Sequence, residues 1–535
     1  MLIFCCLGFA LFPGAGRDDA YITYWPAYSL AELGELANYN GAAVEQSSSL
    51  TLVLALAALR FVTGAPLAWL GWFFGIACGL VTLLLSGQLA RAVNEERAKL
   101  APVCLALAAP FVYWSFSGME TALQALLITG WVLQASRDAT RKERGPVLIR
   151  LLPWTLALCA VRPEAMFVLA CVLIVVTVLP RRGTPEFRSA LWMALGISAG
   201  ILISVRNIWF ESWLPQPAVA KAGRPLAETA ALGMRYLLAH PVASSITTIA
   251  AGTGLWRVLR PRSDQDLTLP LAGLFVGAQL GFVLFSGGDW MEGARFLAPT
   301  LPLCLVLLLG TFQIRAFGWT LALVLAVSSL QFAFGKSRSL FAWQSAETEY
   351  VADEPRLAWF EAKNLVHLRD EPTLVALKQI LASLPADKEP LILTGQGGLV
   401  LFHLRRDHHS PVRVVDRYGL LDRSLSSSPT VLRAGRSRLG LNLGYRDLLR
   451  DWHTIMREAR LPEPDIIFDN GIGRGDEEEL AERGYVKVYG QTGQLIRGSK
   501  RQPAKQVIFL KRELVNSLPA ERLESFQFPE HRVDE

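Results

Sequence analysis

Eleven long apolar runs fill most of the first 336 of the 535 residues and constrain the fold more than any other feature. Each approaches the roughly 20 residues that an α-helix needs to cross a bilayer. They lie at 1–15, 66–90, 100–117, 119–136, 147–162, 163–180, 189–208, 242–258, 268–286, 296–314 and 317–334. Because backbone polar groups must be satisfied inside the hydrocarbon, such runs must be helical. We therefore predict a polytopic α-helical membrane protein with about 11 transmembrane helices.

Charge divides the chain near Lys336. Residues 1–336 hold only 42 charged side chains, 24 basic and 18 acidic, and so carry the whole net charge of +6. Residues 337–535 hold 29 basic and 29 acidic residues, an ordinary soluble composition. We predict a transmembrane domain at 1–336 and a water-soluble domain at 337–535. A neutral tail lacks the basic surface that nucleic acid requires, so the expected partner is the lipid bilayer and not nucleic acid.

Short apolar runs alternate with helical patterns in the tail. The predicted strands are 391–394, 412–415, 465–468, 485–489 and 506–510, and the predicted helices are 371–384, 446–460 and 477–484. This alternation is typical of a small α/β domain. The sequence TGQGG at 394–398 has the composition of a phosphate-binding turn, but a lone glycine-rich turn more often serves loop geometry alone.

The distribution of basic residues predicts the orientation in the membrane. We interpret 48–63, which opens with serines and contains Arg60, as a juxtamembrane helix within an external loop at 16–64. With that choice, 15 of the 24 basic residues fall on the side of the N-terminus. The positive-inside rule then places the N-terminus in the cytoplasm and the tail outside a bacterial inner membrane. We expect the first helix to remain uncleaved, or the natural chain to start upstream of Met1.

Cysteine and histidine spacings do not indicate a metal centre. The seven cysteines all lie in apolar stretches, and no CxxC or Cys/His zinc spacing occurs. We assign no metal ligands and no certain cofactor. The acidic residues of the first external loop leave room for a divalent cation there.

Acidic and basic residues gather at the predicted external ends of the spans. The set comprises Asp18, Asp19, Glu120, Arg162, Glu164, Lys221, Asp289, Glu292 and Arg295. Charges at membrane depth are costly and usually mark function. The competing interpretation is that short loops must be polar and that these residues only cap helices.

An external face has no supply of cytosolic nucleotide sugars, so a transferase there needs a donor carried in lipid. A polyprenyl-phosphate sugar meets this need. Transfer requires a carboxylate to take the proton of the acceptor hydroxyl and cationic groups to hold the departing phosphate. We assign the first role to Asp18 or Asp19 and the second to Arg162, Lys221 and Arg295. Successive side chains alternate on an extended segment, so only one of the two aspartates would act.

The ordered motifs resemble the GT-C class of polytopic glycosyltransferases, closest to its terminal arabinofuranosyltransferase-like branch. The resemblance rests on DDAYITYWPAY and NYNGAAVEQSSSL in the first loop, then SGMET, RPEA, LPQPAVAK and GGDWMEGARF, and more weakly on VVDRYGLLD at 414–422. It implies an inverting transfer to an extracytoplasmic glycan or cell-envelope acceptor. It also implies supporting roles for Glu45, Glu120, Glu164 and Asp289.

The motifs depart from the family pattern at three points. The first loop lacks the Gly-Tyr that usually follows Glu45, Pro217 replaces part of an Asn-Thr-aromatic run, and Glu292 stands where a proline is usual. These departures leave the acids and the Arg/Lys set intact but put the acceptor in doubt. Arabinose is therefore not inferred as the sugar.

Two other functions compete with this interpretation. A multi-pass transporter or flippase for a lipid-linked or envelope substrate would also contain intramembrane charges and prolines. It predicts charges near the span centres and internal repeats, neither of which the sequence shows. A protein O-mannosyltransferase-like enzyme would differ only in the acceptor, and the sequence does not separate it.

Overall fold

The computed structural model describes the following part of the chain. The described residues are 1–11, 19–95, 98–140, 146–178, 184–221, 226–259, 267–289, 291, 293–312, 315–333, 350–351, 372–385, 388–395, 398–407, 412–416, 421, 452–470, 474–497 and 500–518. Asp18 and Glu292 therefore lie outside the described residues.

The chain forms two compact units. Unit 1 comprises Met1–Arg17, Ser48–Pro215 and Pro225–Glu347, and unit 2 comprises Asp18–Ser47, Gln216–Arg224 and Thr348–Glu535. This division differs from a single cut after residue 336, because contacts group residues 18–47 with the tail. Residues 18–47 of the loop predicted at 16–64 are thus part of unit 2, whereas residues 48–64, which include the helix at Leu50–Thr63, belong to unit 1.

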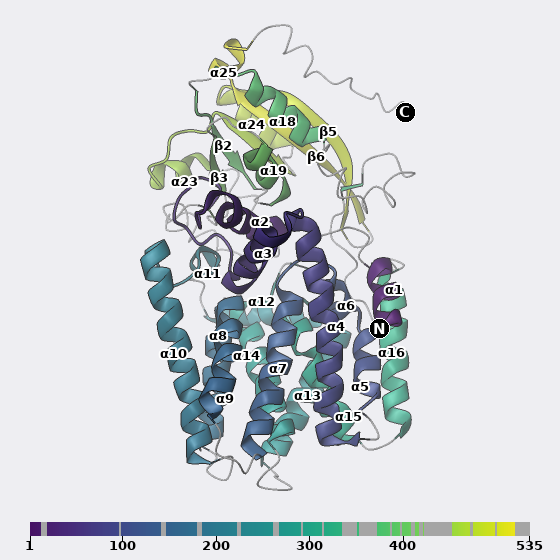
Figure 1. Ribbon diagram of the computed structural model, residues 1–535. Coiled ribbons are helices and arrows are strands. Elements are labelled where there is room, and N and C mark those ends of the chain that lie inside the picture. The colour runs from purple at the N-terminus through teal and green to yellow at the C-terminus, as the bar shows by residue number, and fades with distance from the viewer. Residues whose placement is uncertain are drawn as a thin grey trace. The chain divides into compact units, whose positions relative to one another are not determined.

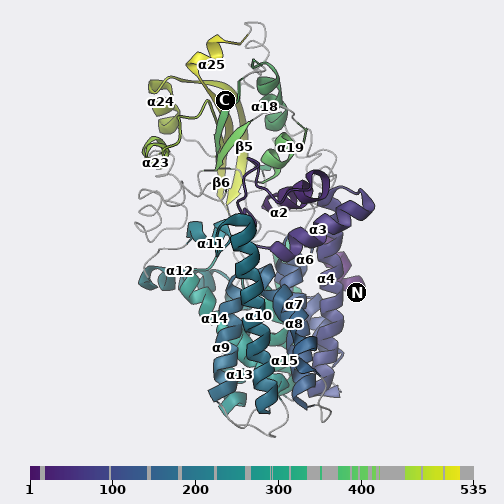
Figure 2. The ribbon, with the colours of Figure 1, turned by 60° about the vertical axis from the view of Figure 1, so that its left-hand side comes forward.

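Unit 1 is a bundle of helices (Figures 1 and 2). Its elements are α1 (Leu2–Leu11), α3 (Leu50–Thr63), α4 (Leu67–Val93), α5 (Leu100–Ala106), α6 (Ala109–Ser115), α7 (Thr121–Thr140), α8 (Val147–Val161), α9 (Glu164–Val178), α10 (Pro185–Phe210), α12 (Leu226–Ala239), α13 (Pro241–Leu259), α14 (Thr268–Ser286), the 3-10 helix η3 (Ala298–Thr300), α15 (Leu301–Thr311) and α16 (Arg315–Ala333). Helix α7 packs against α4 and α8, α8 against α10, and α13 against α14 and α15. The helical character predicted for this part of the chain is confirmed.

One predicted span is broken. The run 100–117 forms two short helices, α5 and α6, that meet at Leu107 and Ala108. Pro110 lies in the first turn of α6. A proline has no N–H to donate and is best tolerated in the first turn of a helix, so Pro110 favours the start of a new helix at this point. The helix predicted at 48–63 is present as α3.

Three helices of the described residues are long and apolar enough to cross a membrane, namely α4, α10 and α14. Shorter apolar helices occur at Leu50–Thr63, Val147–Val161, Glu164–Val178, Ala298–Thr311 and Ala316–Leu330. The count of eleven spans stays a prediction.

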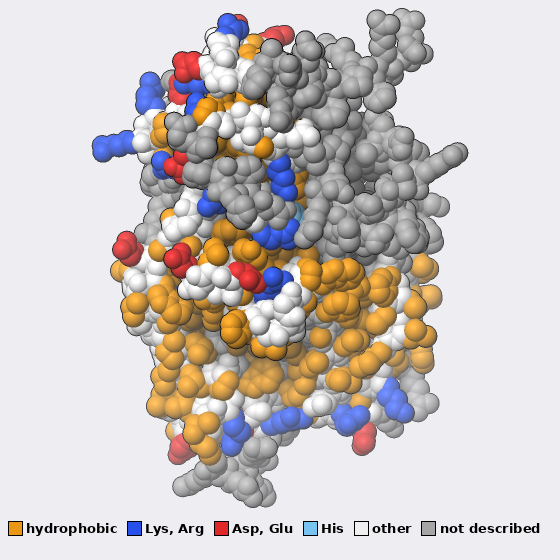
Figure 3. All heavy atoms as spheres, turned by 45° about the horizontal axis from the view of Figure 1, so that its top comes forward, with side chains coloured by type: hydrophobic (Ala, Val, Ile, Leu, Met, Phe, Trp, Pro, Cys, Tyr) orange, Lys and Arg blue, Asp and Glu red, His pale blue; other side chains and the backbone are white. Residues whose placement is uncertain are grey.

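The outer surface of the bundle is itself apolar. Phe167 and Ile174 on α9 and Ile201 and Ile208 on α10 are exposed. Figure 3 shows hydrophobic side chains covering one face of the bundle, with Lys and Arg side chains along its lower edge. Helices that are apolar on their outer side as well as in the core are typical of a membrane domain.

Basic side chains gather at one end of the bundle. Arg137, in the last turn of α7, donates to Gln88 of α4 at 2.9 Å, and Arg150 near the start of α8 pairs with Asp138 at 2.8 Å. Arg257, in the last turn of α13, donates to the Gly310 carbonyl at the end of α15. The interhelical polar contacts at this end thus involve arginines.

Unit 2 contains a six-stranded sheet in the order β1-β5-β6-β4-β2-β3. The strands are β1 (Tyr350–Val351), β2 (Leu391–Thr394), β3 (Arg413–Asp416), β4 (Ile466–Asn470), β5 (Tyr485–Arg497) and β6 (Lys500–Lys511). β2 runs parallel to β3 and β4, whereas β6 runs antiparallel to β4 and β5, and β1 antiparallel to β5. The α/β character predicted for the tail is confirmed.

Helices of the tail surround a small apolar core. The helices are α18 (Pro372–Ala382), α19 (Leu399–Asp407), α23 (Trp452–Glu458), α24 (Arg474–Glu482) and α25 (Arg512–Asn516). Leu393, Val415, Ile467 and Phe509 from four adjacent strands form part of the core. α19 directly follows the TGQGG run and was not predicted. Most of the 414–422 motif, and Gln396 and Gly397 of TGQGG, lie outside the described residues.

The first loop packs onto the tail through α2 (Ala20–Tyr28). Tyr21 of α2 makes an edge contact with Phe402 of α19 at a centroid distance of 5.3 Å. The helix continues as a π-helical turn, η1 (Ser29–Leu33), which ends at Gly34 with φ of 74°. Aromatic packing thus fixes the segment that begins at Asp19.

Asn40 pairs with the backbone of β3, the edge strand of the sheet. Its Nδ2 donates to the Val414 carbonyl at 2.7 Å, and its Oδ1 accepts from the Val414 N–H at 2.8 Å. An edge strand otherwise presents unpaired backbone groups that favour aggregation. One side chain of the first loop therefore satisfies both groups of this edge residue.

We predict that Asn40→Ala destabilises the protein by about 1–3 kcal/mol, because it leaves a backbone donor and an acceptor of β3 without their partner. Thermal unfolding of the purified full chain in detergent measures the effect. The matched control is Asn207→Ala, an exposed position on α10. Equal midpoints for the two variants would show that Asn40 does not secure the loop.

Candidate functional site

Five charged side chains meet at one end of the bundle in unit 1. Glu120 lies in the turn before α7, Arg162 is the residue that ends α8, and Glu164 begins α9. Asp289 and Arg295 come from the connection between α14 and α15. We call these five residues the ion-pair chain. Because α7 rises about 30 Å over 20 residues, the ion-pair chain lies about 30 Å from the arginine at the other end of this helix.

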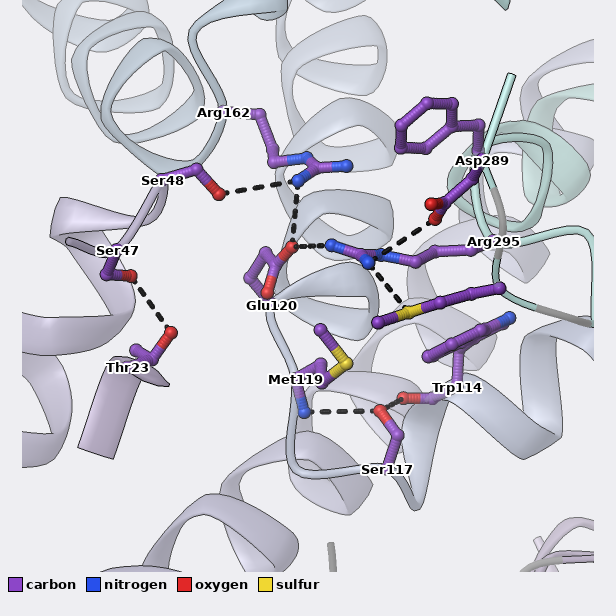
Figure 4. Close-up of polar contacts among 12 residues, drawn as sticks. Thr23, Ser47, Ser48, Trp114, Ser117, Met119, Glu120, Arg162, Asp289 and Arg295 are labelled. Carbon is purple, nitrogen blue, oxygen red and sulfur yellow. Dashed lines mark hydrogen bonds and ion pairs between the residues drawn. The ribbon is translucent and has the colours of Figure 1, made fainter. Parts of the chain in front are cut away.

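The five residues alternate in charge, and Figure 4 labels four of them, Glu120, Arg162, Asp289 and Arg295. Glu120 Oε1 lies 2.9 Å from Arg295 Nη2 and 3.1 Å from Arg162 Nη1, so a single carboxylate oxygen is shared by two guanidinium groups. Arg162 also pairs with Glu164 at 2.9 Å, and Arg295 with Asp289 at 3.3 Å. Two of the three residues assigned to the donor phosphate, Arg162 and Arg295, thus lie together, and their role in binding phosphate stays a prediction.

The ion-pair chain is almost entirely removed from solvent. The side chains of Arg162 and Arg295 are 8% and 9% exposed, and that of Glu120 is 4% exposed. Burial alone would raise the pKa of Glu120, but Arg295 and Arg162 outweigh it and hold the pKa below its ordinary value. The carboxylate therefore contributes stability above its ordinary pKa, and this contribution is lost as the pH falls through the lowered value.

Aromatic rings cover both guanidinium groups. Arg162 lies over the Phe296 ring at 5.2 Å, and Arg295 lies over Trp114 at 5.8 Å. The Trp114 indole N–H donates to the Gly293 carbonyl at 2.8 Å, which fixes the ring. Cations held against aromatic faces keep their planar forks in one orientation, ready for a bidentate anion.

The sequence GGD places Asp289 by its backbone conformation. Gly287 ends α14 with φ of 87°, and Gly288 follows with φ of 73°. A Cβ on Gly288 would lie 2.5 Å from the Cβ of Tyr236, so no other residue fits there without movement. Two successive left-handed residues, which only glycine adopts readily, turn the chain back toward Arg295.

The composition of the ion-pair chain decides what it can bind. Two guanidinium groups face three carboxylates, so the five groups carry a formal charge of −1 when all are ionised. Glu120 occupies the point where the two arginine forks converge. An incoming phosphate must therefore replace or displace a carboxylate to make bidentate contact with the arginines.

Sequence reasoning missed two groups beside the ion-pair chain, Tyr236 and His240. The Tyr236 hydroxyl accepts a hydrogen bond from the Phe296 N–H at 3.0 Å, and its ring makes an edge contact with the His240 ring at 4.8 Å. Burial raises the pKa of Tyr236, and Asp289 adds to that increase. Neither residue belongs to a motif, and a lone Tyr or His in an amphipathic helix has no sequence signal.

Burial lowers the pKa of His240 to about 4, although Asp289 acts in the opposite direction. A histidine in the unfolded chain titrates near pH 6.5. The unfolded state therefore takes up the proton first, and this group costs stability as the pH falls from about 6.5 toward 4. His240 is neutral at physiological pH.

The other predicted site residues lie in unit 2. Asp19 occupies the position before α2, but its side chain makes no capping hydrogen bond, so the interpretation of Asp19 as an N-cap finds no contact to support it. Glu45 is buried, and its carbonyl accepts from the N–H of Gln216, the first residue of α11 (Gln216–Lys221). This bond ties the helix that ends at Lys221 to the first loop. The approach of Lys221 to Arg162 and Arg295 stays a prediction.

No group of three or more Asp, Glu, His or Cys side chains within the described ranges is arranged to hold a metal ion. Asp18 lies outside these ranges. A divalent cation in the first loop is therefore neither supported nor tested.

Comparison with known proteins identifies the fold. No family model and no curated protein sequence matches the chain. Crystal structures of ArnT from Cupriavidus metallidurans match at a TM-score of 0.50. The apo form is 14% identical and covers 96% of this chain and 98% of its own, and the form bound to undecaprenyl phosphate is 13% identical and covers 99% and 98%.

A further match is the oligosaccharyltransferase AglB from Archaeoglobus fulgidus, solved with an inhibitory peptide and a dolichol-phosphate. It is 11% identical, covers 97% of this chain and 76% of its own, and has a TM-score of 0.46. ArnT and AglB are GT-C glycosyltransferases. The chain shares the fold of ArnT, in agreement with the GT-C fold that its motifs predicted.

We predict that Glu120→Gln destabilises the protein by about 3–5 kcal/mol, because it leaves two buried guanidinium groups without their shared carboxylate. Thermal unfolding in detergent at neutral pH measures the loss. Glu164→Gln is the matched control, since among the described residues Glu164 pairs with one arginine, Arg162, and we expect a smaller effect from it. An equal or smaller loss in Glu120→Gln would mean that the shared carboxylate does not hold the site together.

Proposed function

We propose that this protein is a membrane glycosyltransferase that moves a sugar from a polyprenyl-phosphate donor to an extracytoplasmic glycan or cell-envelope acceptor. The observation that carries the proposal is the convergence of Arg162 and Arg295 on one buried anion, the Glu120 carboxylate, at an end of the bundle. A fold shared with ArnT, which has been crystallised with undecaprenyl phosphate, supports the same donor class.

The proposed reaction is a single inverting displacement. The acceptor hydroxyl oxygen forms a bond to the anomeric carbon as the bond between that carbon and the phosphate oxygen breaks. The hydroxyl proton goes to the carboxylate of Asp18 or Asp19. The polyprenyl phosphate leaves with one more negative charge than it had as a phosphodiester, and Arg162, Lys221 and Arg295 stabilise this charge.

The two ends of the bundle support the orientation predicted from the sequence. Arg137, Arg150 and Arg257 lie at one end, whereas the ion-pair chain lies at the opposite end of α7 and α8. The positive-inside rule assigns the arginine-rich end to the cytoplasm. Trp209 and Trp213, which are 51% and 73% exposed at the other end of α10, fit the aromatic belt of a membrane interface. We therefore place the ion-pair chain near the external surface.

A transporter or flippase is the rival function. A flippase must carry the lipid phosphate through the bilayer, which favours charges near the centres of its helices. The ion-pair chain instead lies at helix ends and in the connections between them. This placement favours chemistry at the surface, and the family motifs point to the arabinofuranosyltransferase-like branch without fixing the sugar.

The direct test of the proposed function is transfer of label by membranes that contain the full chain. A panel of radiolabelled polyprenyl-phosphate sugars is supplied with a cell-envelope fraction as acceptor. We expect one sugar to be incorporated, and incorporation should fall strongly in Arg295→Gln. No incorporation from any member of the panel would contradict the proposal.

We predict that Asn in place of the acting aspartate, Asp18 or Asp19, lowers transfer about 10²–10⁴-fold, the usual contribution of a general base. The other Asp→Asn variant should lose less, because that residue would only orient the base or the acceptor. Glu35→Gln, an exposed acid of the same loop, is the matched control and should keep full activity. Full activity in the double Asp→Asn variant would end the general-base assignment.

We also predict an extracytoplasmic C-terminus. An alkaline phosphatase fusion after Glu535, active only outside the cytoplasm, should give a strong signal, and a reporter active only in the cytoplasm should stay silent. The reverse pattern would overturn both the topology and the external site.

A further inference from the structure

His240 is a buried polar group that the proposed mechanism does not use. It connects α12 and α13 in the chain, and the residue is 1% exposed. Its Nδ1 has no hydrogen-bond partner among the described residues. A buried nitrogen of this kind costs free energy unless a ligand or water satisfies it, so it calls for an explanation.

The backbone of His240 is held at the junction of α12 and α13. Pro241 is the first residue of α13, a position that proline favours in helices. The His240 N–H donates to the Leu237 carbonyl at 3.2 Å, and its carbonyl accepts from the Ser244 N–H at 2.9 Å. The residue is therefore locked between two helices by its own backbone.

Two links join His240 to the ion-pair chain. The imidazole contacts the Tyr236 ring, and the Tyr236 hydroxyl bonds the backbone of Phe296, the residue that follows Arg295. The Tyr236 side chain also packs against Gly288, where it occupies the space that a Cβ would need. Asp289 is the next residue in the chain after Gly288. Asp289 in turn acts electrostatically on His240.

The excess negative charge of the ion-pair chain favours an additional positive charge near the bound phosphate, which a protonated His240 would supply. The five residues of the ion-pair chain carry a formal charge of −1, and the donor phosphodiester adds another −1. Transfer then leaves a phosphomonoester with a further negative charge. In a buried site this excess anion is costly unless a proton enters with it.

We propose that His240 is a further phosphate-binding group, which takes up a proton from water when the polyprenyl-phosphate donor binds and holds it through transfer. The inference rests on the proposed function. The proton moves from bulk water to the imidazole, and no bond to the sugar or the phosphate changes in this step. His240 thereby supplies the positive charge that the two arginines, already paired with carboxylates, do not.

The other titratable and charged groups near the imidazole are few within the described residues. Tyr236 faces it from α12, and Asp289 acts on it from the connection after α14. The charged residues of α12 are Glu228 in its first turn and Arg235, which is exposed. Arg295 and Arg162 act on Tyr236. α14 has no charged residue, and the one arginine of α13 lies in its last turn, at the far end of that helix. The imidazole is therefore the group best placed to gain a proton at mildly acidic pH.

The test is the pH dependence of donor binding by the full chain in nanodiscs. The probe is polyprenyl-phosphate glucose, a phosphodiester that does not titrate between pH 5 and 8. If binding returns the pKa of His240 from about 4 to its ordinary value near 6.5, affinity should rise about 20-fold from pH 7 to pH 5. Calorimetry in two buffers of different ionisation enthalpy should show uptake of protons near pH 5.5.

His240→Asn is the matched variant, because its amide reaches the region of Nδ1 but cannot titrate. We expect it to fold and bind, to lose the 20-fold pH effect, and to take up no proton in excess of the background. His240→Leu should bind at least tenfold more weakly than His240→Asn at pH 7, since it removes the polar contact as well.

Three outcomes would overturn the inference. Wild type and His240→Asn with the same pH dependence would show that His240 is only a core residue, while the proposed function still stands if Arg295→Gln abolishes binding. If both His240 variants are folded, as judged by their thermal transitions, and bind the donor with unchanged affinity, His240 is likewise only a core residue. No binding of the probe by the wild type at any pH would contradict the proposed function and the role of His240 together.

Discussion

A single buried carboxylate oxygen, Glu120 Oε1, organises the end of the bundle where the candidate site lies. It accepts from Arg295 and lies within ion-pair distance of Arg162, and these three residues come from three separate parts of the chain. Removing such charges from water is costly, and only mutual pairing offsets the cost. The turn before α7, the end of α8 and the connection before α15 are therefore held at one place. The two glycines at 287–288 turn the backbone so that Asp289 reaches Arg295, and the aromatic rings hold both guanidinium groups in place.

Under the proposed function, the same interaction prepares the site to exchange a carboxylate for a phosphate. The two arginine forks are already directed at an oxygen anion, so little reorganisation of the guanidinium groups is needed when a phosphate takes its place. Without a bound phosphate, the two arginines need the carboxylates as partners. With a phosphate bound, the added negative charge calls for further positive charge. Lys221 and His240 are the two groups to which we assign that charge.

Much of this could be predicted from residue patterns, and the failures have physical causes. The assignment of Arg162 and Arg295 to one lipid phosphate required these residues to approach each other, but no pattern revealed that Glu120 is their shared partner. The break between α5 and α6 was missed because hydropathy does not register Pro110. Strands β5 and β6 extend beyond their predicted ends because residues 490–505 lack apolar alternation, so only pairing defines them. The pairing of Asn40 with Val414 joins residues 374 apart in the chain, a contact that no local pattern encodes.

The central claim is that Arg162 and Arg295 receive the phosphate of a polyprenyl carrier. A cryo-electron microscopy structure of the full chain in nanodiscs with undecaprenyl phosphate tests it most directly. We expect phosphate oxygens within about 3 Å of at least one guanidinium group, with Glu120 moved away from the point where the two forks now converge. A bound lipid phosphate found elsewhere on the protein, with the five residues of the ion-pair chain still paired as they are here, would contradict the account.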